Sequence, residues 1–172
     1  MTFSATGDSV YVTTSDSAGD YALAIIDTTT DAVRTVDLPD DMTDAVHVTP
    51  DGLRAFVMTA SANGIPAAAF TVIDIVTGES EAGSYVEGGE LLTPVRYSDD
   101  SKYAYFVVRA PGQTAGETYD FFIRLDTENV EGGGGDLGAP FQGSIQLSGD
   151  GATGFLLVNQ GRQNYIAINA AD

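Results

Sequence analysis

The sequence has no cysteine, no tryptophan and one histidine in 172 residues. Without cysteine there is no disulfide framework, no thiolate nucleophile, no iron–sulfur cluster and no cysteine-ligated zinc. One imidazole does not make the histidine clusters that hold transition metals. The composition therefore excludes redox and metal chemistry that depends on thiolates or on several imidazoles.

Basic residues are also scarce, since 7 Lys and Arg face 25 Asp and Glu, which gives a net charge of −18 and a pI near 4.1. Binding to DNA or RNA requires a basic surface that releases counterions, and anionic membranes attract basic surfaces for the same reason. We therefore expect no nucleic-acid partner. The charge favours solubility through self-repulsion and suits a high-salt or extracellular setting, although compositional bias produces the same acidity.

Long apolar runs are missing as well. No segment approaches the roughly 18 apolar residues of a membrane-spanning helix, so we expect no membrane insertion. Residues 1–8 lack the basic and apolar regions of a signal peptide. Two localisations stay open: the cytoplasm, or the cell surface or exterior with this chain as part of a longer one.

A repeat is the main feature that the sequence does contain. Four segments read as an apolar residue, a hydroxyl residue, a tight turn and an aromatic strand. Their hydroxyl residues, spaced by 45, 49 and 50 positions, are Ser4, Thr49, Ser98 and Ser148. A second motif, an apolar strand that ends in Asp or Asn, follows in each unit at residues 25–28, 72–75, 123–127 and 166–169. Two motifs in a fixed order indicate four copies of one structural unit.

Each unit is predicted to be a small antiparallel sheet. The segments are short, rich in β-branched and aromatic residues and bounded by Gly, Pro, Asp and Ser, and no stretch of a dozen residues has helical periodicity. In the second unit we expect strands at residues 45–49, 55–60, 69–75 and 81–87. Four strands in about 45 to 50 residues are typical of one propeller blade.

The predicted fold is therefore all-β, a single β-propeller segment over residues 1–172 with about four four-stranded antiparallel blades. The approximate blades are 1–43, 44–92, 93–142 and 143–172, and the last lacks its outer strand. Four glycines at 132–135 fall where the third blade needs its outer strand, and we expect a loop there. Because an open arc leaves apolar faces in water, we expect either a longer parent chain or closure with another copy.

Three acidic residues recur at one corner of the repeat. Asp27, Asp74 and Asp126 each follow an apolar strand and precede Thr or a Thr-containing turn. Their recurrence favours a structural role, in which the carboxylate accepts hydrogen bonds from turn amides, over a catalytic one.

The second unit resembles a known family of repeats. It reads TPDG at 49–52, AFV at 55–57 and VIDIVTG at 72–78, which is similar to the Ser-Pro-Asp-Gly turn, aromatic–valine strand and Ile-Asp-Thr corner of YVTN β-propeller repeats. The third unit departs from this pattern at 99–101, and the fourth has Asn169 at the corner. The resemblance implies a propeller that usually has seven blades. It leaves the activity open, because such propellers serve as surface-layer adhesion modules, scaffolds, lactonases and dehydrogenase subunits.

One repeat position carries four different polar side chains. Two residues before each hydroxyl stand Thr2, His47, Arg96 and Gln146. The innermost strand of a blade lines the central channel, so these residues are the candidate ligand-binding ring. Arg96 would bind a carboxylate with two parallel hydrogen bonds, and His47 would transfer a proton. The alternative interpretation is that they hydrogen-bond between blades or line a water-filled channel.

Acidic loops are the candidate cation sites, because calcium prefers clustered carboxylate and carbonyl oxygens. The densest are residues 16–20 and the loop that holds Asp40, Asp41 and Asp44. Neither has the EF-hand pattern, and acidic runs on loops are commonly just solvated. Calcium is the only cofactor that the sequence suggests.

These observations favour a non-catalytic binding or scaffolding module, part of a larger secreted or cell-surface protein, whose protein or small-molecule partner is unidentified. A lactonase-like hydrolase with His47 and Arg96 at the channel is the first alternative. A calcium-dependent adhesion domain is the second.

Overall fold

The computed structural model describes residues 1–4, 6–39, 46–59, 67–87, 90–112, 114, 116–148, 153–157 and 165–169. In these residues all regular structure is β-strand, in four separate sheets whose neighbouring strands run antiparallel. They contain no helix long and apolar enough to cross a membrane. The candidate cation ligands Asp40, Asp41 and Asp44 lie outside the described residues.

The first two sheets, which we call blades one and two, are meanders of four strands in chain order. Blade one consists of β1 (Thr2–Phe3), β2 (Ser9–Ser15), β3 (Tyr21–Asp27) and β4 (Val33–Asp37). Blade two consists of β5 (His47–Val48), β6 (Arg54–Thr59), β7 (Ala67–Asp74) and β8 (Ser80–Glu87). The four strands expected in the second unit are all present.

The third and fourth sheets continue the pattern as blades three and four. Blade three consists of β10 (Arg96–Tyr97), β11 (Tyr103–Pro111), β12 (Thr118–Asp126) and β13 (Gly132–Asp136), and β9 (Glu90–Leu91) also pairs with β11. The described part of blade four consists of β14 (Gln146–Leu147), β15 (Thr153–Leu157) and β16 (Tyr165–Asn169).

The prediction of a loop at 132–135 is wrong, because these glycines form most of β13. They pair in register with β12, from Leu125 opposite Gly132 to Phe121 opposite Asp136. Strand pairing uses backbone groups, so it does not require side chains. At Gly134 a side chain would be excluded, since a Cβ atom there would collide with the carbonyl oxygen of Phe122.

The chain between blades two and three contributes a short strand to blade three. Leu91 and Glu90 pair with Val108 and Arg109 of β11, and Leu92 N–H donates to the carbonyl of Val107. The cause is that β11 has nine residues whereas β10 has two. The free edge of β11 is therefore paired by the chain arriving from blade two.

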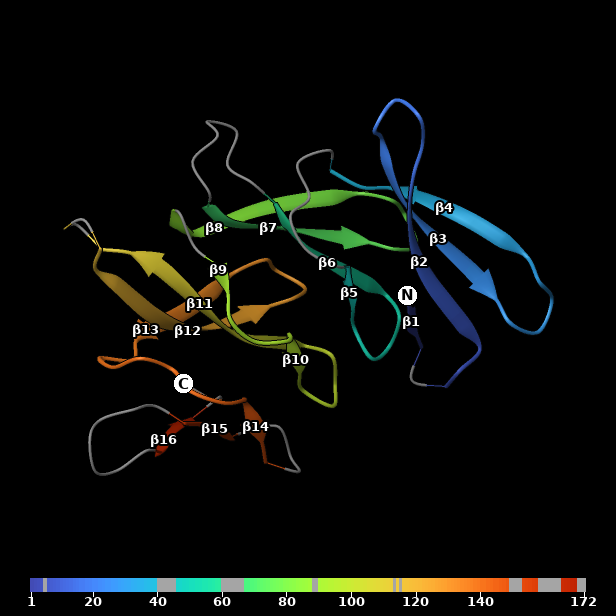
Figure 1. Cartoon of the computed structure of the whole chain (residues 1–172). Helices are drawn as coiled ribbons and strands as arrows, with labels where there is room; N and C mark the ends of the chain where they lie inside the picture. Colours follow the sequence, from blue (N-terminus) through green and yellow to red (C-terminus); the bar gives the residue numbers. More distant parts are fainter. Residues whose placement is uncertain are drawn as a thin grey trace.

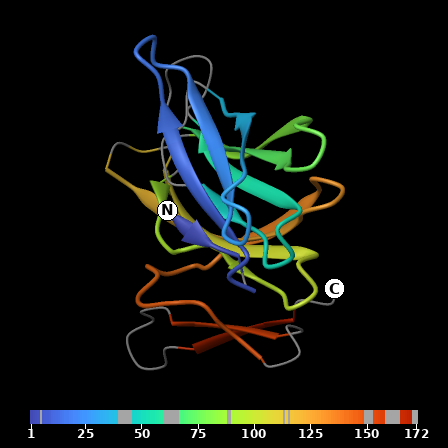
Figure 2. The same ribbon diagram turned by 90° about the vertical axis from the view of Figure 1, so that its right-hand side faces the viewer.

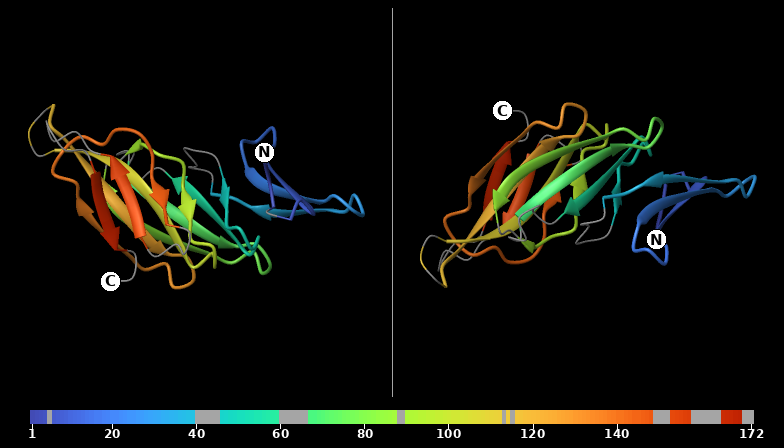
Figure 3. Two further views of the ribbon diagram at one scale, coloured as in Figure 1. Left: turned by 90° about the horizontal axis from the view of Figure 1, so that it is seen from below. Right: turned by 90° about the horizontal axis from the view of Figure 1, so that it is seen from above.

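Figure 1 shows the four blades fanned along an arc, with the inner strands β1, β5, β10 and β14 on one side of it. In the turned view of Figure 2, β14 to β16 stack below blade three. Figure 3 places blade one and blade four at opposite ends. The arc brings each blade against its neighbours in the sequence but leaves its two ends apart.

Apolar cores fill the spaces between neighbouring blades. In blade two, Ala55 and Val57 pack toward blade one, whereas the next side chains along the strand, Phe56 and Met58, pack toward blade three. Phe56 stacks on Phe70 with ring centroids 5.1 Å apart. A sheet covered on both faces needs apolar residues at successive positions, which explains the continuous apolar runs in the sequence.

Candidate functional site

The four candidate ring residues occupy equivalent positions in the four blades. Each is the first residue of an inner strand and pairs with an aromatic residue of the next strand. The pairs are Thr2 with Tyr11, His47 with Phe56, Arg96 with Tyr105, and Gln146 with Phe155. The side chains of Thr2, Arg96 and Gln146 are exposed, and His47 is half-buried. Each belongs to a different blade, and the strands that hold them, β1, β5, β10 and β14, lie along one side of the arc in Figure 1. Their role in ligand binding stays a prediction.

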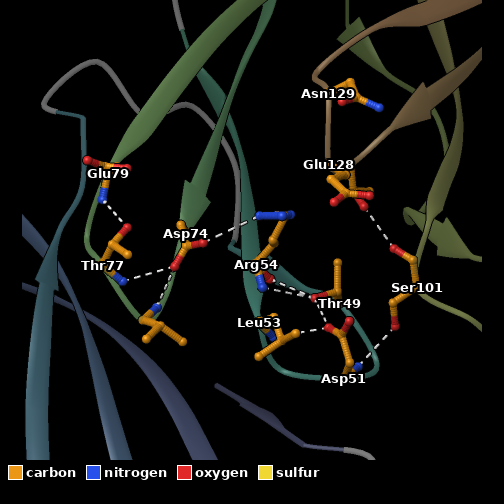
Figure 4. A network of polar contacts seen from close by, with 12 residues as sticks. Thr49, Asp51, Leu53, Arg54, Asp74, Thr77, Glu79, Ser101, Glu128 and Asn129 are labelled. Carbon is orange, nitrogen blue, oxygen red and sulfur yellow. Dashed lines mark hydrogen bonds and ion pairs between the residues drawn. The ribbon is translucent and has the colours of Figure 1, made fainter.

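In blades one to three, the hydroxyl residues of the repeat hold the turn between the first two strands. In blade two, Thr49 Oγ1 donates to Asp51 Oδ1 at 2.6 Å and accepts from the backbone N–H of Arg54 at 3.0 Å. Asp51 Oδ1 also accepts from the N–H of Leu53 at 3.0 Å, as Figure 4 shows. The carboxylate and the hydroxyl together replace the hydrogen bonds that the turn backbone cannot make internally.

The same arrangement recurs in the neighbouring blades. Ser98 Oγ donates to Asp100 Oδ1 at 2.6 Å in blade three, and Ser4 Oγ donates to Asp8 Oδ1 at 2.8 Å in blade one. The hydrogen bond from Ser98 lowers the pKa of Asp100, and those from Thr6 and Ser4 lower the pKa of Asp8. These acids are ionised turn caps.

The corner acids are also turn caps, so their predicted structural role is confirmed. In each of these aspartates the Oδ1 atom accepts hydrogen bonds from two backbone N–H groups, at 2.8 to 3.1 Å. The donors are Thr29 and Thr30 for Asp27, Val76 and Thr77 for Asp74, and Glu128 and Asn129 for Asp126. The bonds from Thr30 and Thr77 are the largest causes of the lowered pKa values of Asp27 and Asp74. Burial raises the pKa of Asp126, but the hydrogen bonds from Asn129 and Glu128, together with the charge of Lys102, lower it below its usual range.

Ser101 explains why the third unit departs from the TPDG pattern. It stands where blade two has Gly52 and takes the same left-handed backbone conformation, with φ of 62° against 73°. Its hydroxyl accepts the N–H of Asp51 from the adjacent turn of blade two at 3.0 Å (Figure 4). A glycine would relax the backbone but would not make this contact between blades.

Two hollows lie along the join between blades two and three. One, of about 330 Å³, lies between the two turns and is lined in part by Asp51, Asp100 and Lys102. The other, of about 500 Å³, lies by the corners and is lined in part by Arg54, Asp74 and Glu128. Their carboxylates include the turn caps, and Asp74 also pairs with Arg54 at 3.5 Å. These hollows therefore coincide with the contacts that join two blades.

The other candidate cation site, the acidic loop at residues 16–20, has a structural explanation. Asp16 Oδ1 accepts the backbone N–H groups of Ala18, Gly19 and Asp20 at 2.8 to 3.1 Å. Among the residues that the structure describes, no three acidic or histidine side chains lie together in a way that would hold a metal ion.

An ion pair in blade three was not identified from the sequence. Arg109 Nε and Nη2 donate to the two carboxylate oxygens of Asp120 at 2.7 and 2.9 Å, and the N–H of Phe141 donates to Asp120 Oδ2 at 2.7 Å. The Asp120 side chain is 2% exposed. Burial raises its pKa, but the bonds from Arg109 and Phe141 outweigh burial and lower it. The available signal was an aspartate between two aromatic residues, Tyr119 and Phe121, near the start of a strand.

This ion pair also borders a small hollow of about 220 Å³ beside Tyr119, Ala139 and Pro140. Asp120 holds the segment that leaves β13 and leads to blade four. Its carboxylate accepts the N–H of Phe141, and its backbone carbonyl accepts the N–H of Leu137 at 2.9 Å. Its evident task is to fix this connection.

No protein-family model and no curated protein sequence matches the chain. Solved structures do match it. Hydrazine synthase of Kuenenia stuttgartiensis aligns with a TM-score of 0.64 and 19% identity, over 98% of this chain and 51% of that one. The β-propeller domain of the Trilobed protease from Pyrococcus furiosus aligns with a TM-score of 0.53 and 18% identity, over 91% of this chain and 47% of that one. The fold is that of a β-propeller.

An oligogalacturonate lyase in complex with manganese is also similar, with a TM-score of 0.68 and 12% identity over 98% of this chain and 48% of that one. At these identities the likeness shows the propeller fold alone. The chain spans about half the length of these three propeller chains.

Proposed function

We propose that this propeller segment is a non-catalytic binding or scaffolding module of a larger secreted or cell-surface protein. The observation that carries the proposal is that the recurring acidic residues have structural roles. The acids at turns and corners each accept backbone or hydroxyl hydrogen bonds inside their own blade. In blades one to three, one acid at the turn and one at the corner hold the backbone, and such a structural use of carboxylates is what a scaffold needs. The TPDG turn and VIDIVTG corner support placing the blades among YVTN-like repeats.

The binding surface in this proposal is the ring on the inner strands. Arg96 is exposed at the start of β10. A guanidinium recognises a planar carboxylate with two parallel hydrogen bonds. In a chain of net charge −18, an exposed cation on the inner side of the arc is a local attraction for an anionic ligand. Thr2, His47 and Gln146 would add hydrogen-bonding groups at the equivalent position, the start of the inner strand, in the other blades.

The experiment that tests this site measures the melting temperature of the chain with acetate, succinate or citrate at constant ionic strength. We expect a rise with at least one carboxylate, because a ligand that binds only the folded state stabilises it. The rise should be lost in Arg96→Ala and kept in Lys102→Ala, which removes an exposed charge from a turn. An equal rise in both variants would contradict a site at Arg96.

The hydrolase alternative is tested with a panel of lactones. If the chain hydrolyses one, and His47→Ala abolishes turnover while the circular dichroism spectrum stays unchanged, the hydrolase replaces the binding module. The adhesion alternative predicts a rise in melting temperature with calcium that magnesium does not reproduce. For a binding module without a calcium site we expect the two ions to act alike.

A further inference from the structure

The outer strand of blade three ends its sheet with a row of backbone groups that face away from the sheet. The sheet order runs β10, β11, β12 and β13, and among the described residues no strand pairs with the outer side of β13. All five residues of β13 are exposed. Blades two and four cover the two faces of blade three through shared apolar cores. They leave its outer edge open.

The pairing of β12 with β13 shows which backbone groups point to this edge. At the two ends of the ladder, Asp126 N–H donates to the Glu131 carbonyl at 2.7 Å and Leu137 N–H donates to the Asp120 carbonyl at 2.9 Å. Along an antiparallel ladder, hydrogen-bonded pairs alternate with pairs whose N–H and C=O groups point away from each other. The residues of β13 that direct both groups outward are therefore Gly132, Gly134 and Asp136.

The outer strands of the first two blades carry features that discourage further pairing, and β13 does not. In β4 every position has a side chain, and Arg34 and Asp37 are exposed charges. The pairing of β8 with β7 has a register shift between Ala68 and Ala69. Charged side chains and bulges both protect the free edge of a sheet. The glycines at 132–135 place no side chain in the way of an added strand.

Acidic side chains stand at both ends of the glycine run. Glu131 precedes it, Asp136 ends it, and both are exposed. Five positions along a strand correspond to about 17 Å, at about 3.3–3.4 Å per residue. A strand added here would therefore meet a negative charge at each end of the open backbone.

The hollow of about 220 Å³ lies at the Asp136 end of β13. Tyr119, which also lines it, is 42% exposed. The charge of Arg109 in the hollow is balanced by its ion pair with Asp120. Asp136 therefore leaves the hollow negative, with an aromatic ring beside the carboxylate, and both attract a cationic side chain.

We propose that β13 binds an extended basic segment of another protein by strand addition. The backbone of the partner pairs with the outward groups of β13, and two basic side chains five positions apart lie beside Glu131 and Asp136. The basic side chain at the Asp136 end enters the hollow. Backbone hydrogen bonds supply the affinity, and the two charges select the partner.

Charge favours a separate basic partner over a second copy of this chain. Two paired copies of β13 would bring both copies of Glu131 and Asp136 onto one short ladder, which like charges disfavour. The chain itself has 7 Lys and Arg in 172 residues, so a segment with two basic residues is better supplied by a different protein. This edge is separate from the inner ring, because β13 and β10 are at opposite sides of the sheet. Carboxylate binding at Arg96 and strand addition at β13 can each fail alone.

The test is the binding of a dye-labelled, end-blocked peptide, Lys-Val-Thr-Val-Thr-Arg, in 0.15 M NaCl, measured by fluorescence anisotropy. We expect saturable binding of one peptide per chain. The control peptide Lys-Pro-Pro-Pro-Pro-Arg has the same charges but no N–H on its four central residues, so it should bind at least about tenfold more weakly. Equal binding of the two peptides, or no binding of the first, would overturn the proposal.

Substitutions test the backbone and the charges separately. Gly132→Pro removes one outward N–H at a position where an edge strand tolerates proline, and it should weaken binding about threefold to tenfold. Glu131→Lys combined with Asp136→Lys should reverse the preference, so that Glu-Val-Thr-Val-Thr-Glu binds better than the basic peptide. The matched control combines Glu79→Lys with Asp99→Lys, in exposed turns away from β13. It should keep the preference for the basic peptide, and the same result in both double variants would contradict a site at β13.

Amide hydrogen exchange locates the site without any substitution. The outward N–H groups of Gly132, Gly134 and Asp136 should exchange more slowly when the basic peptide is added, whereas those of Gly133 and Gly135, which face β12, should change little. Protection that appears elsewhere while β13 is unaffected would overturn the proposal. So would a doubled mass by light scattering without peptide that Gly132→Pro abolishes, because a second copy would then occupy the edge.

Discussion

At the scale of single residues, the recurring polar side chains at the turns and corners are explained by the hydrogen bonds they make within and between blades. Ser101 combines both roles. Its left-handed backbone conformation, with φ of 62°, costs free energy in a residue other than glycine. Its hydroxyl recovers part of that cost by accepting the N–H of Asp51 from blade two.

We therefore expect different effects from two substitutions of Ser101. Ser101→Ala keeps the backbone strain and loses the hydrogen bond, so the free energy of unfolding should fall by about 1–2 kcal/mol. Ser101→Gly loses the same bond but relaxes the backbone by about 1 kcal/mol, so it should remain within about 1 kcal/mol of the parent. Urea unfolding of both variants measures the difference, and an equal loss in both would contradict the role of backbone strain.

Asp120 is the residue whose removal should cost most among the acids described here. Asp120→Asn keeps the shape, but its amide has one acceptor oxygen in place of two, so at least one of the three hydrogen bonds from Arg109 and Phe141 is lost. We expect a loss of about 2–3 kcal/mol in the free energy of unfolding at pH 7. Asp99→Asn, which removes an equal charge from an exposed turn, should have an effect below about 0.5 kcal/mol.

The loss should also depend on pH with a definite sign. The pKa of Asp120 is lower in the folded chain than its ordinary value, so its ionised form stabilises the fold above about pH 4 and this contribution disappears as the pH falls below that. The difference between the parent and Asp120→Asn should therefore shrink between about pH 5 and pH 2. A difference that grows on acidification would contradict this assignment.

At the scale of elements, β13 shows that a glycine run, whose composition predicts a loop, forms a strand where it pairs closely with the neighbouring strand β12. Gly134 lies so near the Phe122 carbonyl and Ile123 Cδ1 that a Cβ atom does not fit, whereas Gly133 and Gly135 have open space at that position. The glycines weaken the strand entropically, and at least one of them is required by the packing of β12 against β13.

Alanine at these three positions should therefore separate packing from entropy. Gly134→Ala should lower the free energy of unfolding by about 2–3 kcal/mol, because β12 and β13 must move apart. Gly133→Ala and Gly135→Ala should leave it unchanged or raise it by up to about 1 kcal/mol, because alanine restricts the unfolded chain more than glycine does. Thermal unfolding of the three variants measures the contrast, and similar losses at all three would show that the strand does not pack as described.

At the scale of the whole molecule, a net charge of −18 on 172 residues opposes every compact or assembled state. Raising NaCl from about 0.01 to about 1 M shortens the screening length from about 30 to about 3 Å. We expect the melting temperature to rise over this range. KCl should act equally, because screening does not distinguish the two cations.

The control for this salt effect is the same measurement at low pH. Near pH 4 many exposed carboxylates are protonated, so the charge is smaller and the rise with salt should be smaller too. A rise of the same size at pH 4 and pH 7 would assign the effect to something other than charge repulsion.

Much of this molecule follows from local chemistry and was therefore predictable. Apolar residues at successive strand positions, the Thr49 to Gly52 turn and the recurring corner acids specify strands and turns through neighbours a few residues away. The period of the repeat also predicts that Thr2, His47, Arg96 and Gln146 start equivalent inner strands, as they do.

The sequence by itself determined the repeat, the strand order within each blade and the capping acids, because each depends on short-range hydrogen bonds and on side-chain alternation. The tertiary structure alone decided that glycines 132–135 form β13, that β9 joins β11 and that Asp120 pairs with Arg109. These features depend on what lies opposite a residue across a strand or a blade, and that neighbour is distant in the chain.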